Sequence, residues 1–226
     1  MWRVCIDSPT IQSESLVEIL SADELARAAR FRFERDQKRF MAARGILRKI
    51  LGGYLEEHPL KIRFDYTSYG KPMLATDSAP NALRFNLSHA GAFVLFAVTY
   101  GNNIGIDMER IRDDVPIAQI AQRFFSLEEN RSLERMDENK RKEVFFQDWT
   151  RKEAVLKAMG EGLSFPMEQL DVSLISGRVL SPITLLDGQR ENSSWYVQDL
   201  FPGRGYAAAI ALEQGDCDLS YLDYSE

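Results

Sequence analysis

The stretch Ile104-Gly105-Ile106-Asp107-Met108-Glu109 decides how the rest of the chain is interpreted. Its apolar and polar residues alternate with the period of two that is typical of a half-buried β-strand. On such a strand Asp107 and Glu109 point to the same face. Two neighbouring carboxylates raise each other's proton affinity unless a cation lies between them, and their hard oxygen atoms suit Mg²⁺. A solvated edge strand whose acids keep the protein soluble explains the same alternation, so the strand alone leaves both interpretations open.

A second stretch, Trp149 to Lys157, lies inside a predicted helix from about Asp137 to Met159. Apolar residues recur in this helix at a spacing that predicts a buried face. Glu153 and Lys157 lie one turn apart at the border of that face. A surface ion pair between them, contributing about 0.2–0.5 kcal/mol, is one interpretation. The other is a third carboxylate for the metal, with a lysine directed at a phosphate that the metal binds.

Composition describes an ordinary globular protein. The chain has 226 residues, of which 45% are hydrophobic and 27% charged, enough for one large domain or two fused halves. Cys5 and Cys217 are its only cysteines, which excludes a disulfide scaffold and a cysteine-rich zinc site and fits a reducing compartment. No apolar run is long enough for a signal peptide or a membrane span, so we expect neither export nor membrane insertion, and a cytoplasmic location.

Charge is unevenly distributed along the chain. The net charge of −6 argues against bulk nucleic-acid binding. Residues 27–49 nevertheless hold nine basic and two acidic residues, a charge of +7 that leaves −13 for the rest of the chain. A concentrated basic face on an acidic protein indicates a small polyanion or an acidic protein partner. A solvated helix face is the alternative interpretation.

The order of the predicted elements indicates an α+β fold. Helices followed by antiparallel strands occur twice, before and after about Ile111, and predict two halves, 1–111 and 112–226, packed side by side. Turn signals at 101–103 predict a hairpin that leads into the Asp107 strand. The acidic tail from Glu213 onward is expected to be loosely held. Predicted helices cover about 22–30, 34–55, 116–125, the residues after 126, and 137–159; predicted strands cover 3–7, 62–66, 84–87, 93–100, 104–109, 170–175, 195–200 and 206–212, with 88–91 as a connection.

Four motifs, in this order along the chain, resemble 4′-phosphopantetheinyl transferases. They are Gly70-Lys71-Pro72, Phe85-Asn86-Leu87-Ser88-His89, Gly105-Ile106-Asp107-Met108-Glu109 and Trp149-x-x-Lys152-Glu153-Ala154-x-x-Lys157. The resemblance runs from about Phe31 to Leu163, and the length is similar to that of the surfactin-synthetase-activating type. That type implies a monomer with two similar halves, each with helices on a small antiparallel sheet, related by a pseudo-twofold axis.

This resemblance implies a reaction and a set of catalytic residues. Phosphopantetheine would pass from coenzyme A to a serine of an acyl- or peptidyl-carrier protein, with release of adenosine 3′,5′-bisphosphate. Asp107, Glu109 and Glu153 would hold Mg²⁺, or Mn²⁺, against the pyrophosphate. Glu153 is also a candidate to accept the serine proton, either directly or through a metal-bound water. Lys152 and Lys157 would lie near the pyrophosphate as cations.

The resemblance also implies contacts with the 3′-phosphate of coenzyme A. His89 would contact this phosphate, with Ser88 and the backbone near Asn86 beside it. A lone histidine beside a strand is more often a packing residue, so the motif position carries this assignment. Arg39 and Arg44 match basic positions on the same phosphate, which would give the +7 segment a ligand.

Further expectations concern the two ends of the substrate. Gly70-Lys71-Pro72 would approach the adenine, with the glycine allowing close backbone contact. Phe125 and Glu129 stand where the family meets its carrier partner, although a core aromatic and a surface acid explain them equally well. Glu161 stands where many relatives carry a lysine, which leaves the carrier preference open.

Two other function classes use some of the same residues. A metal-dependent nuclease or phosphoesterase would need an acid-x-lysine pair beside the metal, and the stretch from Asp107 to Arg110 has no lysine. A carrier-docking module without activity would be expected to lack some of the residues Asp107, Glu109, Glu153 and Lys157, and all four are present. The transferase is therefore the favoured interpretation.

Overall fold

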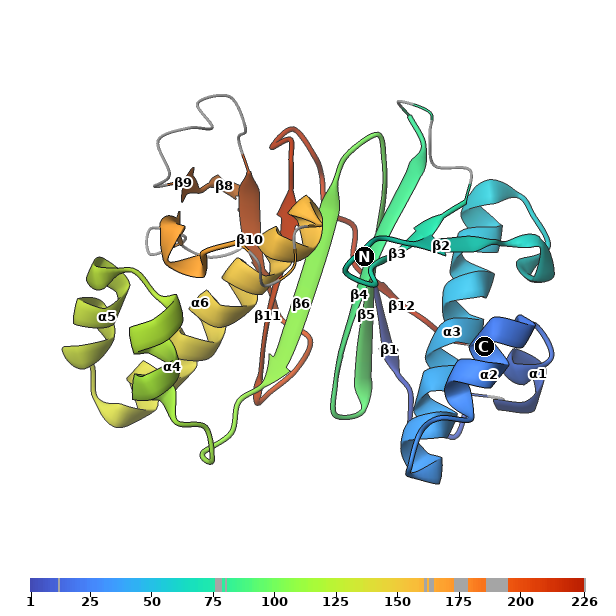
Figure 1. Cartoon of the computed structure of the whole chain (residues 1–226), viewed down its shortest axis with the longest axis horizontal. Coiled ribbons are helices and arrows are strands. Elements are labelled where there is room, and N and C mark those ends of the chain that lie inside the picture. Colours follow the sequence, from blue (N-terminus) through green and yellow to red (C-terminus); the bar gives the residue numbers. More distant parts are fainter. Residues whose placement is uncertain are drawn as a thin grey trace.

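The computed structural model describes every residue except 12, 76–78, 80, 161, 163–164, 173–178, 186–194 and 226. Figure 1 shows two halves side by side, each with a long helix lying across a small sheet. The two long helices have 22 residues each, and each of the two main sheets has four strands. The predicted α+β class with two similar halves is confirmed.

The elements follow the chain in two blocks. The first half contains β1 (Trp2–Cys5), α1 (Ser13–Val17), α2 (Ala22–Ala28), α3 (Glu34–Leu55), the 3₁₀ helix η1 (Pro59–Lys61), β2 (Phe64–Tyr66), β3 (Pro72–Leu74), β4 (Leu83–Ala90) and β5 (Phe93–Tyr100). The second block contains β6 (Ile104–Arg110), α4 (Ile117–Phe124), α5 (Leu127–Glu134), α6 (Glu138–Met159), the 3₁₀ helix η3 (Met167–Gln169), β7 (Leu170–Asp171), β8 (Ser181–Pro182), β9 (Thr184–Leu185), β10 (Tyr196–Leu200), β11 (Tyr206–Leu212) and β12 (Leu222–Asp223). Only the beginning of the predicted strand 170–175 lies among the described residues.

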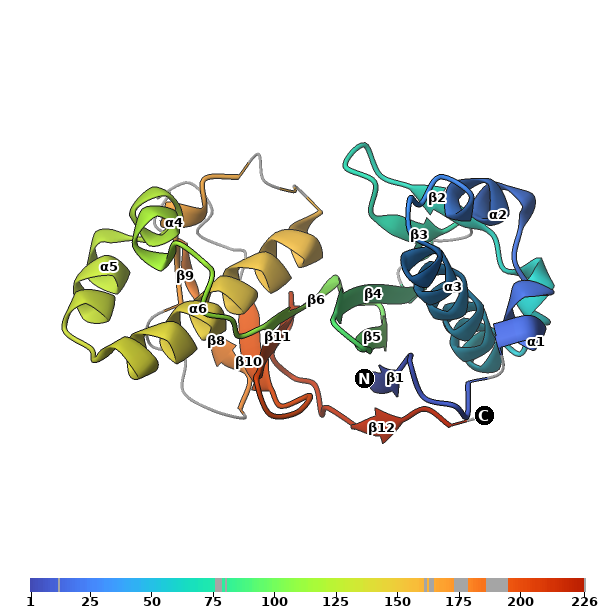
Figure 2. The ribbon, with the colours of Figure 1, turned by 90° about the horizontal axis from the view of Figure 1, so that it is seen from below.

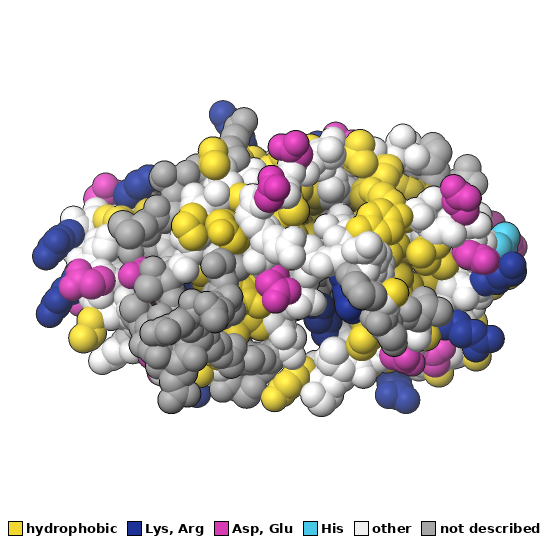
Figure 3. All heavy atoms as spheres, turned by 90° about the horizontal axis from the view of Figure 1, so that it is seen from above, with side chains coloured by type: hydrophobic (Ala, Val, Ile, Leu, Met, Phe, Trp, Pro, Cys, Tyr) yellow, Lys and Arg dark blue, Asp and Glu magenta, His cyan; other side chains and the backbone are white. Residues whose placement is uncertain are grey.

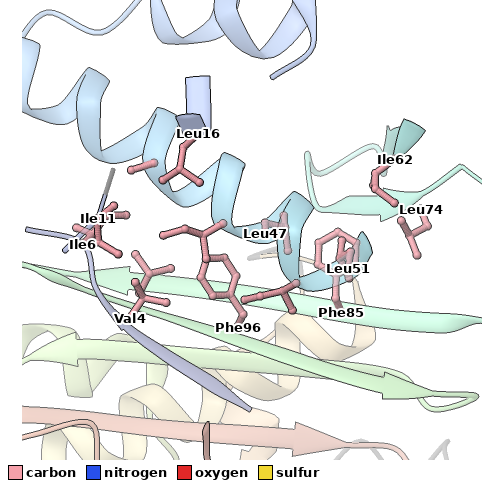
Figure 4. Packing of buried hydrophobic residues seen from close by; sticks show 14 of the residues in the cluster. Val4, Ile6, Ile11, Leu16, Leu47, Leu51, Ile62, Leu74, Phe85 and Phe96 are labelled. Carbon is pink, nitrogen blue, oxygen red and sulfur yellow. The ribbon is translucent and has the colours of Figure 1, made fainter. Parts of the chain in front are cut away.

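The core of the first half lies between α3 and the sheet β12-β1-β5-β4. Leu47 and Leu51, one turn apart on α3, are fully buried against Phe85 of β4 and Phe96 of β5 (Figure 4). This spacing is the helical period that predicts 34–55 as one helix, and α3 has those bounds. Burial of this apolar stripe fixes α3 on the sheet and leaves its other face to the basic residues.

A buried ion-pair cluster fixes α2 against α3. Glu24 of α2 is 1% exposed, and its two carboxylate oxygens accept hydrogen bonds from Arg44 at 2.8 Å and Arg48 at 2.7 Å. Arg48 also donates to the carbonyl oxygens of Pro59 and Ile62. Two arginines of the +7 segment are therefore internal residues of the fold.

The sheet of the second half has the order β6-β11-β10-β8. Strand β6, predicted to belong to the first half, therefore belongs to the second. The predicted hairpin between β5 and β6 is wrong, because β5 pairs with β1 and β4 whereas β6 pairs with β11. The turn at 101–103 carries the chain from one sheet to the other, so the strands of the second sheet begin at Ile104, before the predicted boundary at 111.

Strand β4 is longer than predicted. It continues through Ser88 and His89 to Ala90, which pairs with Phe93 of β5 across a two-residue turn. Gly91 occupies that turn with a φ of +58°, a backbone conformation that favours glycine. Residues expected in a connection are therefore held by the regular hydrogen bonding of a strand.

The C-terminal tail is held to the first half, contrary to the expectation of a loose end. Strand β12 pairs in parallel with β1, and Figure 2 shows it crossing beneath the molecule to reach that strand. Asp223 accepts hydrogen bonds from Arg3 at 2.8 and 3.1 Å, and the amino group of Met1 donates to Ser220 at 2.8 Å. The tail thus links the two halves. Among the described residues, no helix is long and apolar enough to cross a membrane.

We predict that Glu24→Gln lowers the free energy of unfolding by about 3–5 kcal/mol, because it leaves two buried guanidinium groups without their carboxylate. Denaturant unfolding measures the change. Glu34→Gln is the matched control, since Glu34 forms an exposed pair with Lys38 in α3 and its loss should change stability little. Equal effects of the two substitutions would contradict a structural role for the Glu24 cluster.

Candidate active site

Helix α6 lies against strand β6 at one glycine. A Cβ atom on Gly105 would lie 2.0 Å from the carbonyl oxygen of Ala154 and 2.4 Å from the nitrogen of Ala158, closer than real Cβ atoms approach other atoms. The missing side chain therefore lets the helix backbone touch the strand. Asp137 caps the start of the helix through a bond from Lys140 N, and Gly160 ends it with a φ of +76°.

The face of the second sheet that α6 covers combines acids with very small residues. Strand β11 supplies an alanine opposite the glycine and the two acids of β6. The pairs are Gly105 with Ala211, Asp107 with Ala209, and Glu109 with Ala207. Because alanine fills little space, the carboxylates and the helix side chains can share this face. The opposite face carries Ile106 and Met108 into the core, as their alternation predicts.

Asp107 is buried at this contact, and only one of its oxygens is bonded. Its Oδ1 accepts hydrogen bonds from Lys157 Nζ at 2.6 Å and from Ser88 Oγ at 3.0 Å. Its Oδ2 is buried without a hydrogen-bond partner among the described residues. Lys157 of α6 thus pairs with the strand acid within the second half, and this pairing differs from the surface pair with Glu153 that the spacing allowed.

Glu109 and Glu153 are electrostatically coupled to Asp107. Burial raises the pKa of Glu153 most, and the Asp107 carboxylate raises it further, while Lys157 opposes this shift. Burial also raises the pKa of Glu109, again with Asp107 as the next cause. The Asp107 carboxylate therefore disfavours ionisation of both Glu109 and Glu153.

These residues fit a divalent cation by their chemistry. A buried carboxylate oxygen without a partner, next to two acids whose ionisation is disfavoured, is an environment that a cation would stabilise. In the described part of the chain, no group of three His, Cys, Asp or Glu residues is arranged closely enough to hold a metal ion. The convergence of all three acids on one ion stays a prediction.

His89 and Arg39 lie near the seam, which is the contact between the two halves of the chain. Burial of its ring lowers the pKa of His89 although the residue is partly exposed, and Lys157 lowers it further, with a smaller contribution from Arg39. Arg39 of α3 also donates to Asp7 at 2.9 Å. The structure therefore brings His89 together with two cations from different halves of the chain.

Two predicted phosphate contacts lie elsewhere. Arg44 is 5% exposed, binds Glu24 and Tyr66, and stacks 4.3 Å from the centre of the Phe64 ring. Lys152 is completely buried, where its Nζ forms an ion pair with Glu129 at 2.8 Å and donates to Met167 and Leu170. Both cations are neutralised inside the fold, because each lies on the buried side of its helix. The spacing of residues at the border of a helix face could not predict whether these two cations point into the fold.

Phe125 and Glu129 are core residues of the second half. Phe125 is 3% exposed and stacks on Phe145 with ring centres 5.3 Å apart, as the core interpretation predicts. Glu129 is 1% exposed and also accepts a hydrogen bond from Val172 N, so it is not the surface acid of the other interpretation. Glu161 lies outside the described residues.

The segment Gly70-Lys71-Pro72 lies between two cavities. Lys71 Nζ donates to the carbonyl oxygens of Lys157 at 2.5 Å and Ile104 at 3.2 Å, which attaches the first half to the end of α6. Lys71 and Pro72 line a cavity of about 140 Å³ that reaches Met159 and Gly160. Gly70 borders a larger hollow of about 630 Å³ on its other side.

This larger hollow contains residues that the sequence interpretation missed. Arg27, Arg30, Phe31 and Tyr66 line it together with Gly70 and Asp23. The sequence feature that could have identified this hollow is Phe31, an aromatic residue between Arg30 and Arg32. In the structure the Phe31 side chain remains 41% exposed. Figure 3 shows basic and acidic side chains reaching the surface near the middle of the molecule, where the two halves meet.

Comparison with known proteins covers nearly the whole chain. Residues 8–100 match the N-terminal part of 4′-phosphopantetheinyl transferases, and residues 103–211 match the 4′-phosphopantetheinyl transferase superfamily. The 4′-phosphopantetheinyl transferase HetI of Nostoc sp. is 40% identical over 94% of this chain and 86% of its own. The transferase Sfp of Bacillus subtilis is 29% identical over 100% of this chain and 98% of its own. The L-aminoadipate-semialdehyde dehydrogenase-phosphopantetheinyl transferase of Homo sapiens is 31% identical over 88% of this chain and 69% of its own.

We predict that Gly105→Ala lowers the free energy of unfolding by about 3 kcal/mol or more, because the new methyl group meets helix backbone rather than a flexible side chain. Gly53→Ala is the matched control: Gly53 lies in α3 with nothing within 4 Å of its Cβ position, so this change should stabilise by about 0.5–1 kcal/mol. Chemical denaturation measures both. A tolerated Gly105→Ala would show that the helix can move away from the strand at little cost.

Proposed function

The chain belongs to the 4′-phosphopantetheinyl transferase superfamily, and we propose that its seam binds coenzyme A and Mg²⁺ for transfer to a carrier-protein serine. The observation that carries this proposal is the buried Asp107 carboxylate, which has one oxygen without a hydrogen-bond partner among the described residues, beside Lys157, Glu109 and Glu153. Because the family consists of phosphopantetheinyl transferases, a nuclease and a docking module without activity are both disfavoured. Transfer of a phosphoryl-linked group depends mainly on positioning and charge neutralisation.

Asp107, Glu109 and Glu153 are the residues that would hold the cation. When bound, Mg²⁺ would neutralise pyrophosphate charge and polarise the phosphorus that is attacked. Lys157, already bonded to Asp107, supplies a second positive charge at this position.

Glu153 is the proposed acceptor of the serine proton. Its raised pKa brings the carboxylate nearer to neutral pH, where a general base works best. Glu153 lies one turn before Lys157 on α6, so the proposed proton acceptor and the positively charged lysine come from a single rigid helix. Asp107, which is bonded to Lys157 and Ser88, is the less mobile of these two acids.

Coenzyme A would lie along the first half. We assign its 3′-phosphate to His89 and Arg39, because the Arg39 guanidinium lies close enough to contribute to the lowered pKa of His89. The adenine fits the hollow beside Gly70, where Phe31 and Tyr66 offer aromatic faces for stacking and Arg27 adds positive charge. Arg44 and Lys152 have no part in this assignment.

The carrier protein would approach the seam with its serine. We propose a monomeric enzyme, because one chain supplies both halves of the site, and a cytoplasmic one, because Cys5 and Cys217 are free thiols. Incubation with coenzyme A, Mg²⁺ and a panel of apo-carrier proteins should add about 340 Da, the mass of the transferred group, to at least one of them. Intact-mass spectrometry measures the addition, and no addition to any carrier would overturn the proposal.

We predict that Glu153→Gln lowers kcat by about 10²–10⁴-fold without lowering Tm. A raised carboxyl pKa means that the ionised form destabilises the fold as pH rises through that pKa, and glutamine removes this cost. Glu143→Gln is the matched control, because Glu143 is exposed on the same helix and should leave kcat unchanged. Full activity of the Glu153 variant would exclude it as the base.

We predict that His89→Ala raises the KM for coenzyme A about tenfold, since a hydrogen bond to a charged group contributes about 1.5 kcal/mol. Dephospho-coenzyme A, which lacks the 3′-phosphate, is the control substrate. Its KM should be almost the same for the wild-type protein and the variant. Equal increases for both substrates would remove His89 from the 3′-phosphate.

A further inference from the structure

We propose that Ser88 is a positioning residue whose hydroxyl group holds the Asp107 carboxylate in the orientation that leaves one oxygen available to the cation. This inference rests on the magnesium site proposed above. The motif resemblance placed Ser88 beside the 3′-phosphate, yet its described bonds lead to the other side of the strand, towards the acid. Ser88 is 5% exposed, so its hydroxyl must find its partners within the protein.

The Ser88 hydroxyl has its full set of partners. It donates to Asp107 Oδ1 at 3.0 Å, and it accepts from Met108 N at 3.1 Å and from Lys157 Nζ at 3.4 Å. A hydroxyl group has one donor and two acceptor positions, so all three are used. A single atom of β4 therefore connects the acid, the backbone of β6 and the lysine of α6.

These bonds leave the two oxygens of Asp107 in different states. Oδ1 is held by Ser88 and Lys157 together, whereas Oδ2 is buried without a partner among the described residues. A partial rotation of the carboxylate about its Cβ–Cγ bond would break both bonds, whereas a half turn only exchanges two equivalent oxygens. The hydroxyl thus opposes rotation and keeps one lone-pair-bearing oxygen available, as groups around a metal ligand commonly do.

Asn86 provides an internal comparison. It lies two residues before Ser88 on the same face of β4, is 4% exposed, and accepts a hydrogen bond from Ile106 N at 2.9 Å. Strands β4 and β6 belong to different sheets, so Asn86 and Ser88 replace backbone pairing between them with side-chain bonds. Both residues join the halves, but only Ser88 has a bond to Asp107 or Lys157 in the described structure. An experiment can therefore separate the role of joining the two halves from the role of positioning Asp107.

The test is calorimetric titration of Mg²⁺ into the whole protein holding coenzyme A, together with thermal unfolding. Ser88→Ala should weaken Mg²⁺ binding about 10–100-fold, the usual effect of losing a group that orients a metal ligand. Ser88→Thr keeps the hydroxyl and should stay within about threefold of the wild type. Asn86→Ala loses one bond between the halves and should lower Tm about as much as Ser88→Ala while changing Mg²⁺ affinity only a few fold.

Unchanged Mg²⁺ affinity in a folded Ser88→Ala protein would overturn the inference and leave the magnesium site intact. An equal loss of affinity in Asn86→Ala would also overturn it, because the effect would then come from joining the halves. If the wild-type protein binds no Mg²⁺, the proposed metal site itself fails, and the inference fails with it. If the threonine variant does not fold, the comparison of the two alanine variants still decides whether Ser88 positions Asp107.

Discussion

Helix α6 can touch strand β6 only because Gly105 has no side chain, and the charged groups of the site depend on that contact. The helix carries Glu153 and Lys157, and the strand carries Asp107 two residues beyond the glycine on the same face. A residue with a Cβ at this position would separate the backbones, and the 2.6 Å bond between Lys157 and Asp107 would be lost. The alanines of β11 extend the same constraint across the sheet, since larger residues would lift the helix beside the glycine.

Two of the buried clusters and the acids at the seam differ in how far their charges are neutralised. Glu24 with its arginines, and Glu129 with Lys152, place opposite charges within 2.8 Å and satisfy them internally. Such clusters fix helices in place and offer nothing to a ligand. At the seam, by contrast, one lysine faces several acids, and burial raises the pKa of Glu109 and Glu153. An incompletely neutralised cluster destabilises the folded chain, and it is explained most simply as a site prepared for a positively charged ligand.

Much of the fold could be predicted from local pattern alone. Helical periodicity identifies α3 and α6, and alternation identifies β6, because these signals depend only on neighbouring residues. The partner of β6 could not be predicted, since a strand that follows a turn signal pairs by default with the strand before it, and here distant β11 is the partner. The pairing of the C-terminal tail with β1 could not be predicted for the same reason, because the two strands are distant in the sequence. Within the site, motif spacing identifies Asp107, Glu153 and Lys157, but whether a cation such as Arg44 or Lys152 points inward depends on acids elsewhere in the chain.

The way in which the halves are joined connects the fold to the chemistry. Within each sheet, strands are held by ladders of backbone bonds, which substitutions other than proline leave in place. Between β4 and β6, the bonds come from Asn86 and Ser88, and Lys71 attaches the first half to the end of α6. Each such bond contributes only about 1 kcal/mol to stability. The halves also share a hydrophobic cluster, in which Leu95 and Ala97 of β5 pack with Ile106 and Met108 of β6, so loss of one such bond should leave the protein folded with its halves in contact. Because the acids lie on one half and the proposed coenzyme contacts on the other, relative position of the halves is what catalysis depends on, more than the stability of either.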